Sequence, residues 1–454
     1  MGPRVPRTPG FQARPRGVLL TVCLISLVTI WLCRLPKMCL YGEGIAHLQP
    51  QSAPQALNRI DLSKADSPFV SWPLQRVCEE TTTWTSGVVF VCDNNSGGIG
   101  NIRNYILTCL RYAIDAGATG VVLPQITTRS EKDLSNIRMG RQGFDYFFDE
   151  VHFRQGLQTA CPQITLYNST DDIPHAPVPF KAEQITPRDF GRRGGCDNRE
   201  LNKHTGRFAQ QFWAHINRTA EEYKRPPPSI NHPRIIRFNW GVQWDWPVFR
   251  DGPEFVATFG GLLRFRQDIL DLGEKTAAHM RQFALAHGGT RSFAGFHLRT
   301  ESDALSRWPK FDEQSGAYLE KASGMTFKAA YLATGNKTEA QKLTAAASER
   351  HGIAVVTKHQ LLAGHPEELA ALEALTWDQQ ALIDFVVLLE CDYFFGVSPS
   401  SFSMNVALKR HLWAEGLYTR PWRIGGDGDG RSWLVGKYEH YWEDWLFMFE
   451  SLWP

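Results

Sequence analysis

Four ionisable side chains alternate along one short stretch of the sequence, His297-Leu-Arg299-Thr-Glu301-Ser-Asp303. The apolar run 293–296 precedes them and is typical of a buried strand. Residues at a spacing of two share one face of a strand, so these four side chains can enter one crevice. An edge strand with a solvated, salt-bridged face is the simpler interpretation. Because four charges beside an apolar strand are costly unless they serve a site, we favour the functional crevice.

Two serines and a phenylalanine, Ser400-Ser401-Phe402, stand where a predicted strand passes into a predicted helix. Hydroxyl groups and free N–H groups at a helix start are good partners for phosphate. Taken alone, these serines are better explained as a helix N-cap.

A glycine-rich turn, Gly97-Gly98-Ile99-Gly100-Asn101, follows the predicted strand Val88–Val91. Such a turn exposes backbone N–H groups to a phosphate or a sugar. A dinucleotide fingerprint needs a third glycine where Arg103 stands, and it needs an acidic residue that is missing, which argues against a nicotinamide oxidoreductase. Alone, the turn is equally well explained as a tight connection between strand and helix.

The elements that must position these residues form two α/β series. The first series is a βαβ unit, with strands predicted at 88–91 and 120–123 around a helix predicted over 102–116. A long helix is predicted over 259–286. The second series has strands predicted at 293–298, 329–333, 353–356 and 393–397 and helices predicted at 378–390 and 401–410. Segment 128–233 is less regular and predicts long loops that line a substrate cleft. The pattern favours an α/β protein with two Rossmann-like domains that face each other.

The N-terminal segment predicts a membrane anchor. Arginines precede an apolar run over 17–33, whose 17 residues are at the short end of what spans a bilayer. The flanking charges put the tail 1–16 in the cytosol and the rest in the lumen. A cleaved signal peptide is the alternative, but the residues after the run offer no clean cleavage site. A polar stem is predicted over 34–75, so we expect a single-pass type II protein of the Golgi or endoplasmic reticulum membrane.

Other features of the 454-residue chain agree with a lumenal body. Glycosylation sequons occur at Asn94, Asn168, Asn217 and Asn336. Seven of the nine cysteines follow the apolar run, and some of them should form disulfides in an oxidising lumen, although the pairing cannot be read. No Cys/His spacing predicts a metal site, and the formal net charge of +2 gives no reason to expect nucleic acid.

Taken together, the three motifs resemble those of the GDP-fucose protein O-fucosyltransferase family, whose members share a GT-B architecture. The glycine turn ending in Asn101, the His-x-Arg strand with a following Asp, and the interval pattern from Asp384 to Phe402 all match the family in order and spacing. The segment 144–153 and the H-x-R-x-E-x-D form look like the plant and fungal branch. The resemblance extends in pieces from about residue 87 to residue 411.

The resemblance implies a role for each matching residue. Arg299 would be the catalytic residue that contacts the diphosphate and the glycosidic oxygen. Substrate-binding residues would be Gly98, Gly100, Asn101, His297, Asp303, Asp384, Ser400, Ser401 and Phe402. Among these, Asp384 would accept hydrogen bonds from guanine, and the role of Glu301 is open. Some members carry a glutamate beside the glycine turn as general base. Here Asp93, a loop carboxylate or the departing phosphate would take the proton.

The expected function is inverting transfer of fucose from GDP-fucose to a hydroxyl of a protein or a glycan, without a metal or other cofactor. The alternatives are the same chemistry with another GDP-sugar, or a catalytically silent sugar-nucleotide-binding protein. The retained Arg299 argues against the silent form. The expected domains are residues 76–288 on the acceptor side and residues 289–454 on the GDP-sugar side.

Overall fold

The computed structural model describes residue 57 and residues 60–177, 181–186, 208–239, 246–415, 424, 429–441 and 443–454. The predicted cytosolic tail, the predicted anchor at residues 17–33 and much of the predicted stem lie outside these ranges. Within the described ranges, no helix combines the length and the apolar character needed to cross a membrane.

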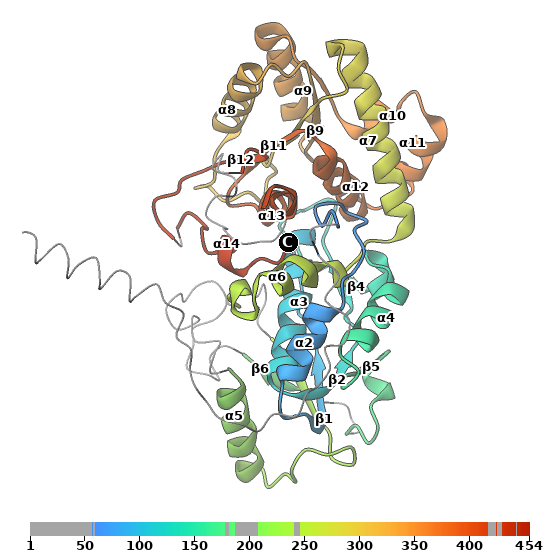
Figure 1. Ribbon diagram of the computed structural model, residues 1–454, viewed down its shortest axis with the longest axis vertical. Helices are drawn as coiled ribbons and strands as arrows, with labels where there is room; N and C mark the ends of the chain where they lie inside the picture. The colour runs from blue at the N-terminus through green and yellow to red at the C-terminus, as the bar shows by residue number, and fades with distance from the viewer. Residues whose placement is uncertain are drawn as a thin grey trace, which may run out of the picture. The chain divides into compact units, whose positions relative to one another are not determined.

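Two five-stranded parallel sheets form the centre of the described chain (Figure 1). The first sheet has the order β5-β2-β1-β7-β6, with β1 (Thr85–Val91), β2 (Ala118–Val122), β5 (Thr165–Tyr167), β6 (Glu183–Ile185) and β7 (Arg234–Phe238). The second has the order β10-β9-β8-β11-β12, with β8 (Ala294–His297), β9 (Ala329–Ala333), β10 (Ala354–Val356), β11 (Tyr393–Val397) and β12 (Ser432–Val435). A separate antiparallel hairpin joins β3 (Ile126–Thr128) to β4 (Gly140–Gln142). The predicted α/β class with parallel sheets is confirmed.

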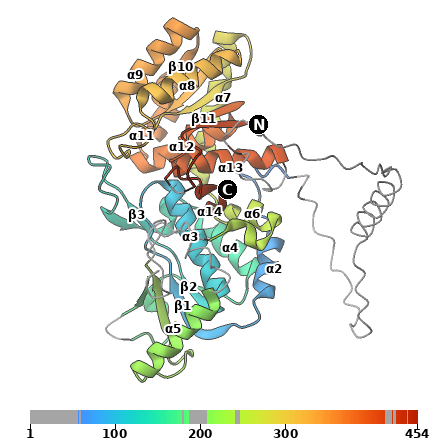
Figure 2. The same ribbon diagram turned by 90° about the vertical axis from the view of Figure 1, so that its left-hand side faces the viewer.

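Helices connect the strands and cover the sheets (Figure 2). Those of the first half are α2 (Trp72–Glu80), α3 (Ile99–Asp115), α4 (Glu150–Ala160), α5 (Phe208–Glu222), α6 (Pro253–Phe259) and α7 (Gln267–Gly288), with 3-10 turns at Phe144–Tyr146, Thr170–Asp172, Val248–Asp251 and Gly260–Leu262. Those of the second half are α8 (Phe311–Gly324), α9 (Lys337–Ala346), α10 (Lys358–Leu362), α11 (Pro366–Glu373), α12 (Trp377–Glu390), α13 (Ser401–Glu415) and α14 (Met448–Ser451), with a π-helical turn at Ala347–His351.

The strand order marks where each sheet can receive a ligand. In the second sheet the chain runs from β8 to β9 and β10 on one side and then crosses to β11 and β12 on the other. Open α/β sheets bind ligands at such a switch point, beyond the carboxyl ends of the two strands that flank it. In this sheet those strands are β8 and β11. In the first sheet they are β1 and β7, because the chain again fills one side before it crosses.

The predicted strands at 329–333 and 393–397 match β9 and β11 residue for residue. Two other predictions were wrong. The long helix begins only at Gln267, since Gly260 and Gly261 interrupt it and α6 precedes them. Segment 128–233, predicted as long loops, contains α4, α5 and strands β4 to β6. The predicted domain limits remain a prediction.

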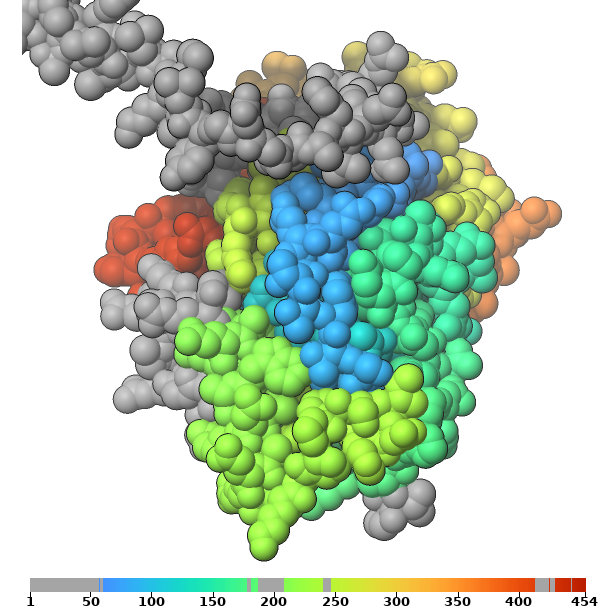
Figure 3. Space-filling view, turned by 60° about the horizontal axis from the view of Figure 1, so that its bottom comes forward, coloured from blue at the N-terminus to red at the C-terminus, as the bar shows by residue number. Residues whose placement is uncertain are grey.

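Two disulfides join elements of the first half of the described chain, as expected for an oxidising compartment. Cys78 and Cys161 join α2 to the end of α4, which lie side by side on one face of the chain (Figure 3). Cys92 and Cys109 join the end of β1 to α3, and so hold the two ends of the glycine turn. Cys391 is buried and free, while Cys39 and Cys196 lie outside the described residues.

Helix α3 packs against α13, which connects the first sheet to the second. The buried guanidinium of Arg103 on α3 donates to Asn405 Oδ1 of α13 at 2.8 Å and to the Gly260 carbonyl at 2.9 Å. Burial lowers the pKa of Arg103 to about 10, so this side chain stays charged at neutral pH. A buried charge needs such partners, which makes the contact between the two helices specific.

Candidate functional site

A cavity of about 1820 Å³ opens where the switch points of the two sheets meet. Its wall combines the start of α3 with residues beyond β8, β9 and β11. Nine of the ten predicted site residues line it: Gly98, Asn101, His297, Arg299, Asp303, Asp384, Ser400, Ser401 and Phe402. The tenth, Gly100, lies behind the wall in the contact between α3 and α13.

Arg299 is held by two carboxylates inside this cavity. Its guanidinium donates to Glu301 at 2.6 Å and to Asp303 at 2.8 Å, and its side chain is 16% exposed. Its backbone N–H and carbonyl both pair with the Gln314 amide, which fixes the main chain. Burial alone would lower the pKa of Arg299, but the two carboxylates outweigh burial and raise it. The structure brings together the four ionisable side chains of this motif, although β8 ends at His297, so the loop after the strand and not the strand itself positions the last three.

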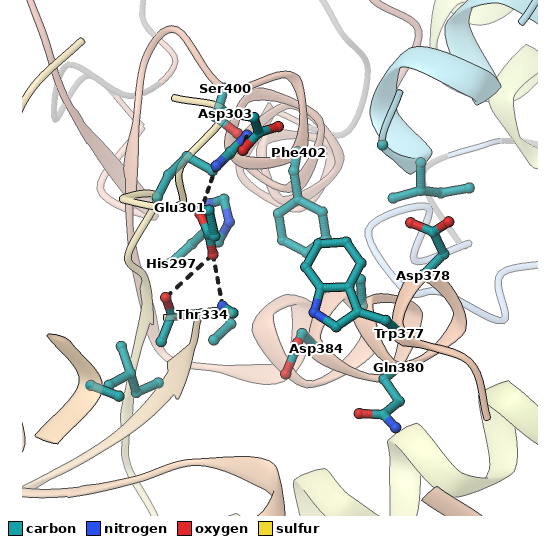
Figure 4. Close-up of a pocket in the computed structure, with 18 of the residues that line it drawn as sticks. His297, Glu301, Asp303, Thr334, Trp377, Asp378, Gln380, Asp384, Ser400 and Phe402 are labelled. Atoms are coloured by element: carbon teal, nitrogen blue, oxygen red, sulfur yellow. Dashed lines mark hydrogen bonds and ion pairs between the residues drawn. The ribbon is translucent and has the colours of Figure 1, made fainter. Parts of the chain in front are cut away.

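Glu301 forms an ion pair with Arg299 and holds its guanidinium in place. This contact gives Glu301 a role, which the sequence had left open. One carboxylate oxygen of Glu301 accepts from the Arg299 guanidinium, and the other accepts from the Gly335 N–H at 2.7 Å and from the Thr334 hydroxyl at 3.4 Å (Figure 4). Burial raises the pKa of Glu301, but the charge of Arg299, the neighbouring His297 and the hydrogen bond from the Gly335 N–H together outweigh burial, and the net pKa is lowered. The buried carboxylate therefore stays ionised and connects Arg299 to the turn after β9.

His297 is a neutral imidazole at the end of β8. Burial lowers its pKa to about 4, and its Nδ1 lies 2.6 Å from the Ser403 hydroxyl of α13. Ser403 comes this close because Gly396 of β11 has no side chain: a Cβ there would lie 2.6 Å from the Ser403 hydroxyl oxygen. The Phe402 ring packs on the imidazole, with centroids 4.6 Å apart. One ring nitrogen is thus occupied by Ser403, and His297 lines the cavity without a positive charge.

Two helix starts meet at the cavity. The helix α3 begins at Ile99 with Gly98 as its N-cap, so Gly100 and Asn101 lie in the first turn of the helix. The sequence had predicted that these two residues lie in a turn before the helix. The start of α13 lies against it, since a Cβ on Gly100 would be 2.7 Å from the Ser401 carbonyl oxygen. Helix starts present free N–H groups and partial positive charge. Two of them at one point form a site for a strongly anionic group such as a diphosphate.

Ser400 does act as a helix cap, the simpler role considered from the sequence. Its hydroxyl accepts from the Ser403 N–H at 3.4 Å, and its carbonyl accepts from the Met404 N–H at 2.8 Å. Ser400 also lines the cavity together with Ser401 and Phe402. Capping and exposure to a ligand are therefore combined at this helix start.

A family model described as GDP-fucose protein O-fucosyltransferase matches residues 89–413, a range that includes both helix starts and Arg299. The chain belongs to the GDP-fucose protein O-fucosyltransferase family. It is accordingly a glycosyltransferase, as the sequence motifs predicted.

Solved fucosyltransferases are also similar to this family member. The apo form of POFUT1 is 15% identical, over 78% of this chain and 99% of that chain, with a TM-score of 0.42. NodZ from Bradyrhizobium is 15% identical, over 72% and 92%, with a TM-score of 0.36. A mutant of Arabidopsis thaliana FUT1 in complex with GDP is 11% identical, over 74% and 72%, with a TM-score of 0.37. No curated protein sequence matches the chain significantly.

Asp384 of this glycosyltransferase lies on α12 with both carboxylate oxygens already engaged. One accepts from the Tyr331 hydroxyl at 2.7 Å, and the other accepts from the Lys358 ammonium at 2.6 Å. Each carboxylate oxygen has two lone pairs, so two acceptor positions remain for a ligand in the cavity. The residue therefore keeps the capacity to accept from a base, with its orientation fixed by its neighbours.

Asp93, the first candidate for the general base, is not among the cavity-lining residues. It is buried and paired with Arg141 of β4 and with Arg237 of β7, so both ion pairs of its carboxylate are made outside the cavity wall. The prediction that Asp93 takes the acceptor proton is therefore not supported by its position. Asp378 does line the cavity, and burial raises its pKa to about 6.

Several cavity residues were missed from the sequence. Arg129 follows β3, pairs with Asp303 at 3.4 Å and lies 5.8 Å from the Trp377 ring. Trp308 lies 5.6 Å from the Arg299 guanidinium on another wall. These residues stand singly between unrelated neighbours in the sequence, so no local pattern identified them; only the fold brings them to the site.

Proposed function

We propose that the chain is an inverting fucosyltransferase that moves fucose from GDP-fucose to a hydroxyl group of a protein or a glycan. Family membership supports the donor and the type of reaction. The observation that carries the proposal is the position of Arg299, which lines the same cavity as the starts of α3 and α13. A charged guanidinium beside two helix N-termini suits a diphosphate leaving group.

The proposed reaction is a single displacement at the anomeric carbon. The acceptor oxygen forms a bond to C1 of fucose while the bond from C1 to the β-phosphate oxygen breaks, and the electron pair of that bond goes to the phosphate. Negative charge grows on departing GDP, and Arg299 is proposed to stabilise it through paired N–H donors. Stabilisation of charge that exists only in the transition state is what raises kcat.

The acceptor proton is proposed to pass to an oxygen of the departing β-phosphate. Two carboxylates beside Arg299 are poorly suited to take it, since Glu301 and Asp303 are each engaged with a guanidinium. Asp93 lies outside the cavity wall. His297 and Asp303 would orient the donor, and Asn101 would reach the leaving phosphate from the first turn of α3.

Guanine selectivity is proposed to come from Asp384. A carboxylate can accept from both N1–H and the exocyclic amine of guanine, which uracil and adenine do not offer in that arrangement. Tyr331 and Lys358 would hold the carboxylate in place. The same arrangement would serve another GDP-sugar, and that donor remains the second candidate.

A binding screen with a transfer assay tests these proposals. Thermal shift of the purified protein with GDP, GDP-fucose, GDP-mannose, UDP and ADP should show stabilisation by guanine nucleotides only. Arg299→Ala should abolish fucose transfer while Arg291→Ala, at an exposed arginine, keeps it. The anomeric proton and carbon signals of the product, read by NMR, should report inversion. Equal stabilisation by UDP, or transfer by Arg299→Ala at the normal rate, would defeat the proposal; nucleotide binding without any transfer would favour the silent binding protein.

We also propose a GT-B fold, in which two domains face each other. The protein is proposed to lie in the lumen of the Golgi or the endoplasmic reticulum, held at the membrane by a type II anchor at residues 17–33. Two disulfides and exposed sequon asparagines at Asn168 and Asn217 suit such a compartment. Glycosidase treatment of the expressed protein should shift its mass, and Asn168→Gln with Asn217→Gln should reduce that shift. An unglycosylated protein that extracts without detergent would contradict the proposal.

Metal-independent catalysis is also proposed, because Arg299 and the two helix starts can supply the positive charge that a metal supplies elsewhere. The rate of transfer should be unchanged when a chelator is added to folded enzyme. A rate that falls with chelator and returns with magnesium or manganese would contradict it.

A further inference from the structure

A second group of ligand-type side chains lies away from the cavity, where α11 packs on α7. It consists of His279 in α7, His365 at the N-cap of α11 and Glu368 in the first turn of α11. One nitrogen or oxygen from each residue lies within 4.8 Å of the other two. None of the three lines the cavity, so this cluster is separate from the proposed donor site.

The two imidazoles of the cluster face each other. The rings of His279 and His365 stack with centroids 3.5 Å apart and planes 23° apart. Because a metal ion lies in the plane of each imidazole that binds it, one of the two rings must turn out of the stack before both can hold the same ion. The Nδ1 atom of His279 is buried and has no hydrogen-bond partner within the described ranges. An unpaired buried nitrogen is costly, so a ligand that binds it would be stabilised. Burial, followed by the charge of His365, lowers the pKa of His279, which keeps this imidazole in the neutral form that metals bind.

The local structure of α11 aims the other two groups at His279. His365 and Glu368 are three residues apart at a helix start, a spacing that places side chains on the same side. Backbone bonds hold His365, whose N–H donates to Leu362 and whose carbonyl accepts from Leu369. The Glu368 carboxylate makes no hydrogen bond or ion pair with another described residue. The carboxylate of Glu368 thus lies beside both imidazoles and interacts electrostatically with His279.

We propose that His279, His365 and Glu368 form a site for a divalent transition metal ion, for which zinc is the best match. Two imidazole nitrogens and one carboxylate oxygen are zinc ligands, and water would complete a tetrahedron. Calcium and magnesium prefer oxygen ligands and would bind poorly. The ion would tie α11 to α7, and α11 leads directly into Glu373, Leu375 and Trp377 of the cavity wall. Because none of the three ligands lines the cavity, the role of the ion would be structural, and the metal-site proposal does not rest on the proposed transfer reaction.

Titration of the purified full-length protein tests the site. After treatment with a chelator and dialysis, cobalt should give the visible absorption of tetrahedral coordination, and zinc should bind at one ion per chain and raise the Tm. His279→Ala and His365→Ala should each weaken zinc binding by at least about 100-fold, since loss of an outer-shell partner alone costs roughly 10–100-fold. Glu368→Gln keeps the shape of the side chain and should weaken binding less.

The matched control is His287→Ala, an exposed histidine on the same helix whose ring contacts Phe283, one turn earlier in that helix. This variant should bind zinc like the wild type. Circular dichroism checks that each variant is folded, and Glu368→Gln provides a test if an alanine variant does not fold. Absence of one-to-one zinc binding in the wild type would overturn the proposal. Equal binding by the wild type and by all three cluster variants would overturn it as well.

Discussion

Gly100 gives the sharpest test of how the two helix starts meet. A Cβ at this position would lie 2.7 Å from the Ser401 carbonyl oxygen and 2.8 Å from its carbonyl carbon. Ordinary contact begins at 3.4 Å, so Gly100→Ala requires the helix starts to separate by about 0.7 Å. The obstacle is backbone, which cannot rotate away as a side chain can.

Two effects of Gly100→Ala oppose each other. Alanine is a better helix former than glycine by about 0.5–1 kcal/mol, which would stabilise α3. Forced separation of well-packed elements typically costs about 1–3 kcal/mol. We therefore expect a net loss of about 1 kcal/mol with a fall in Tm. Because misplacement near 1 Å can cost about 100-fold in rate, turnover should fall by at least about tenfold.

The control for this experiment is two residues away in the same turn. Nothing lies within 4 Å of a Cβ built on Gly98, and its φ of −80° suits any residue. Gly98→Ala should keep the Tm of the wild type, so any loss of donor affinity would report direct approach of the donor to Gly98. The assays are thermal melting, donor KM and kcat for each variant. A Gly100→Ala protein with raised Tm and normal turnover would refute the close contact of α3 and α13.

Three further predictions concern the charges of the cavity. Glu301→Gln removes the ion pair to Arg299, and because a hydrogen bond to a charged group contributes about 1.5–3 kcal/mol, kcat should fall about 10–100-fold; an unchanged kcat measured with saturating donor would contradict the supporting role. The pKa of His297 is about 4 in the folded protein and 6.5 in the unfolded chain, so below pH 6.5 only the unfolded chain takes up this proton. Stability should therefore fall between pH 6.5 and pH 4, by up to about 3 kcal/mol, and denaturant melts of His297→Gln should show a smaller fall. Arg129→Ala leaves Asp303 with one cationic partner among the described residues, so Asp303 should hold Arg299 more tightly and donor KM should rise about 5–10-fold at nearly constant kcat; steady-state kinetics that show the reverse split would contradict this expectation.

Local sequence patterns were sufficient to predict those elements whose structure is decided by burial of apolar side chains alone. The strands β9 and β11 were predicted at their true ends because short apolar runs between turns have one stable solution in a parallel sheet. The start of α3 was predicted three residues late, since glycines weaken a helix when it is judged by propensity. The contact with α13 stabilises that turn, and it is invisible in the sequence. For α4, a readable signal was overlooked: Asp149 caps the helix by accepting from the His152 N–H.

The site was predictable in its motifs but not in its partners. Arg299 and its two carboxylates lie within five residues, so their alternation revealed them. Arg129 lies 174 positions from Asp303, and no rule of spacing joins them. The His279, His365 and Glu368 cluster was missed for the same reason, since His279 is distant from His365 in the sequence and neither stands in a metal-ligand motif. Side chains that meet only through tertiary packing produce no periodic pattern in the sequence.

The charges of the cavity explain how a buried arginine can be ready for an anion before the anion arrives. Six acidic side chains and four basic ones line the wall: Glu131, Glu301, Asp303, Glu373, Asp378 and Asp384 against Arg129, Arg299, Lys337 and Lys358. Attraction by net positive charge therefore cannot be what draws in a diphosphate.

Exchange of partners around Arg299 is the better explanation. Each carboxylate that holds Arg299 has another donor: Asp303 has Arg129, and Glu301 has the Gly335 N–H. When a phosphate takes over a guanidinium N–H, neither carboxylate is left buried and unpaired, so the penalty for breaking the ion pair is reduced. The released guanidinium then meets the phosphate in a site where two helix starts already favour negative charge. Selectivity for an anion thus depends mainly on whether the carboxylates that hold Arg299 keep another hydrogen-bond donor when the anion binds. The net charge of the cavity wall matters less.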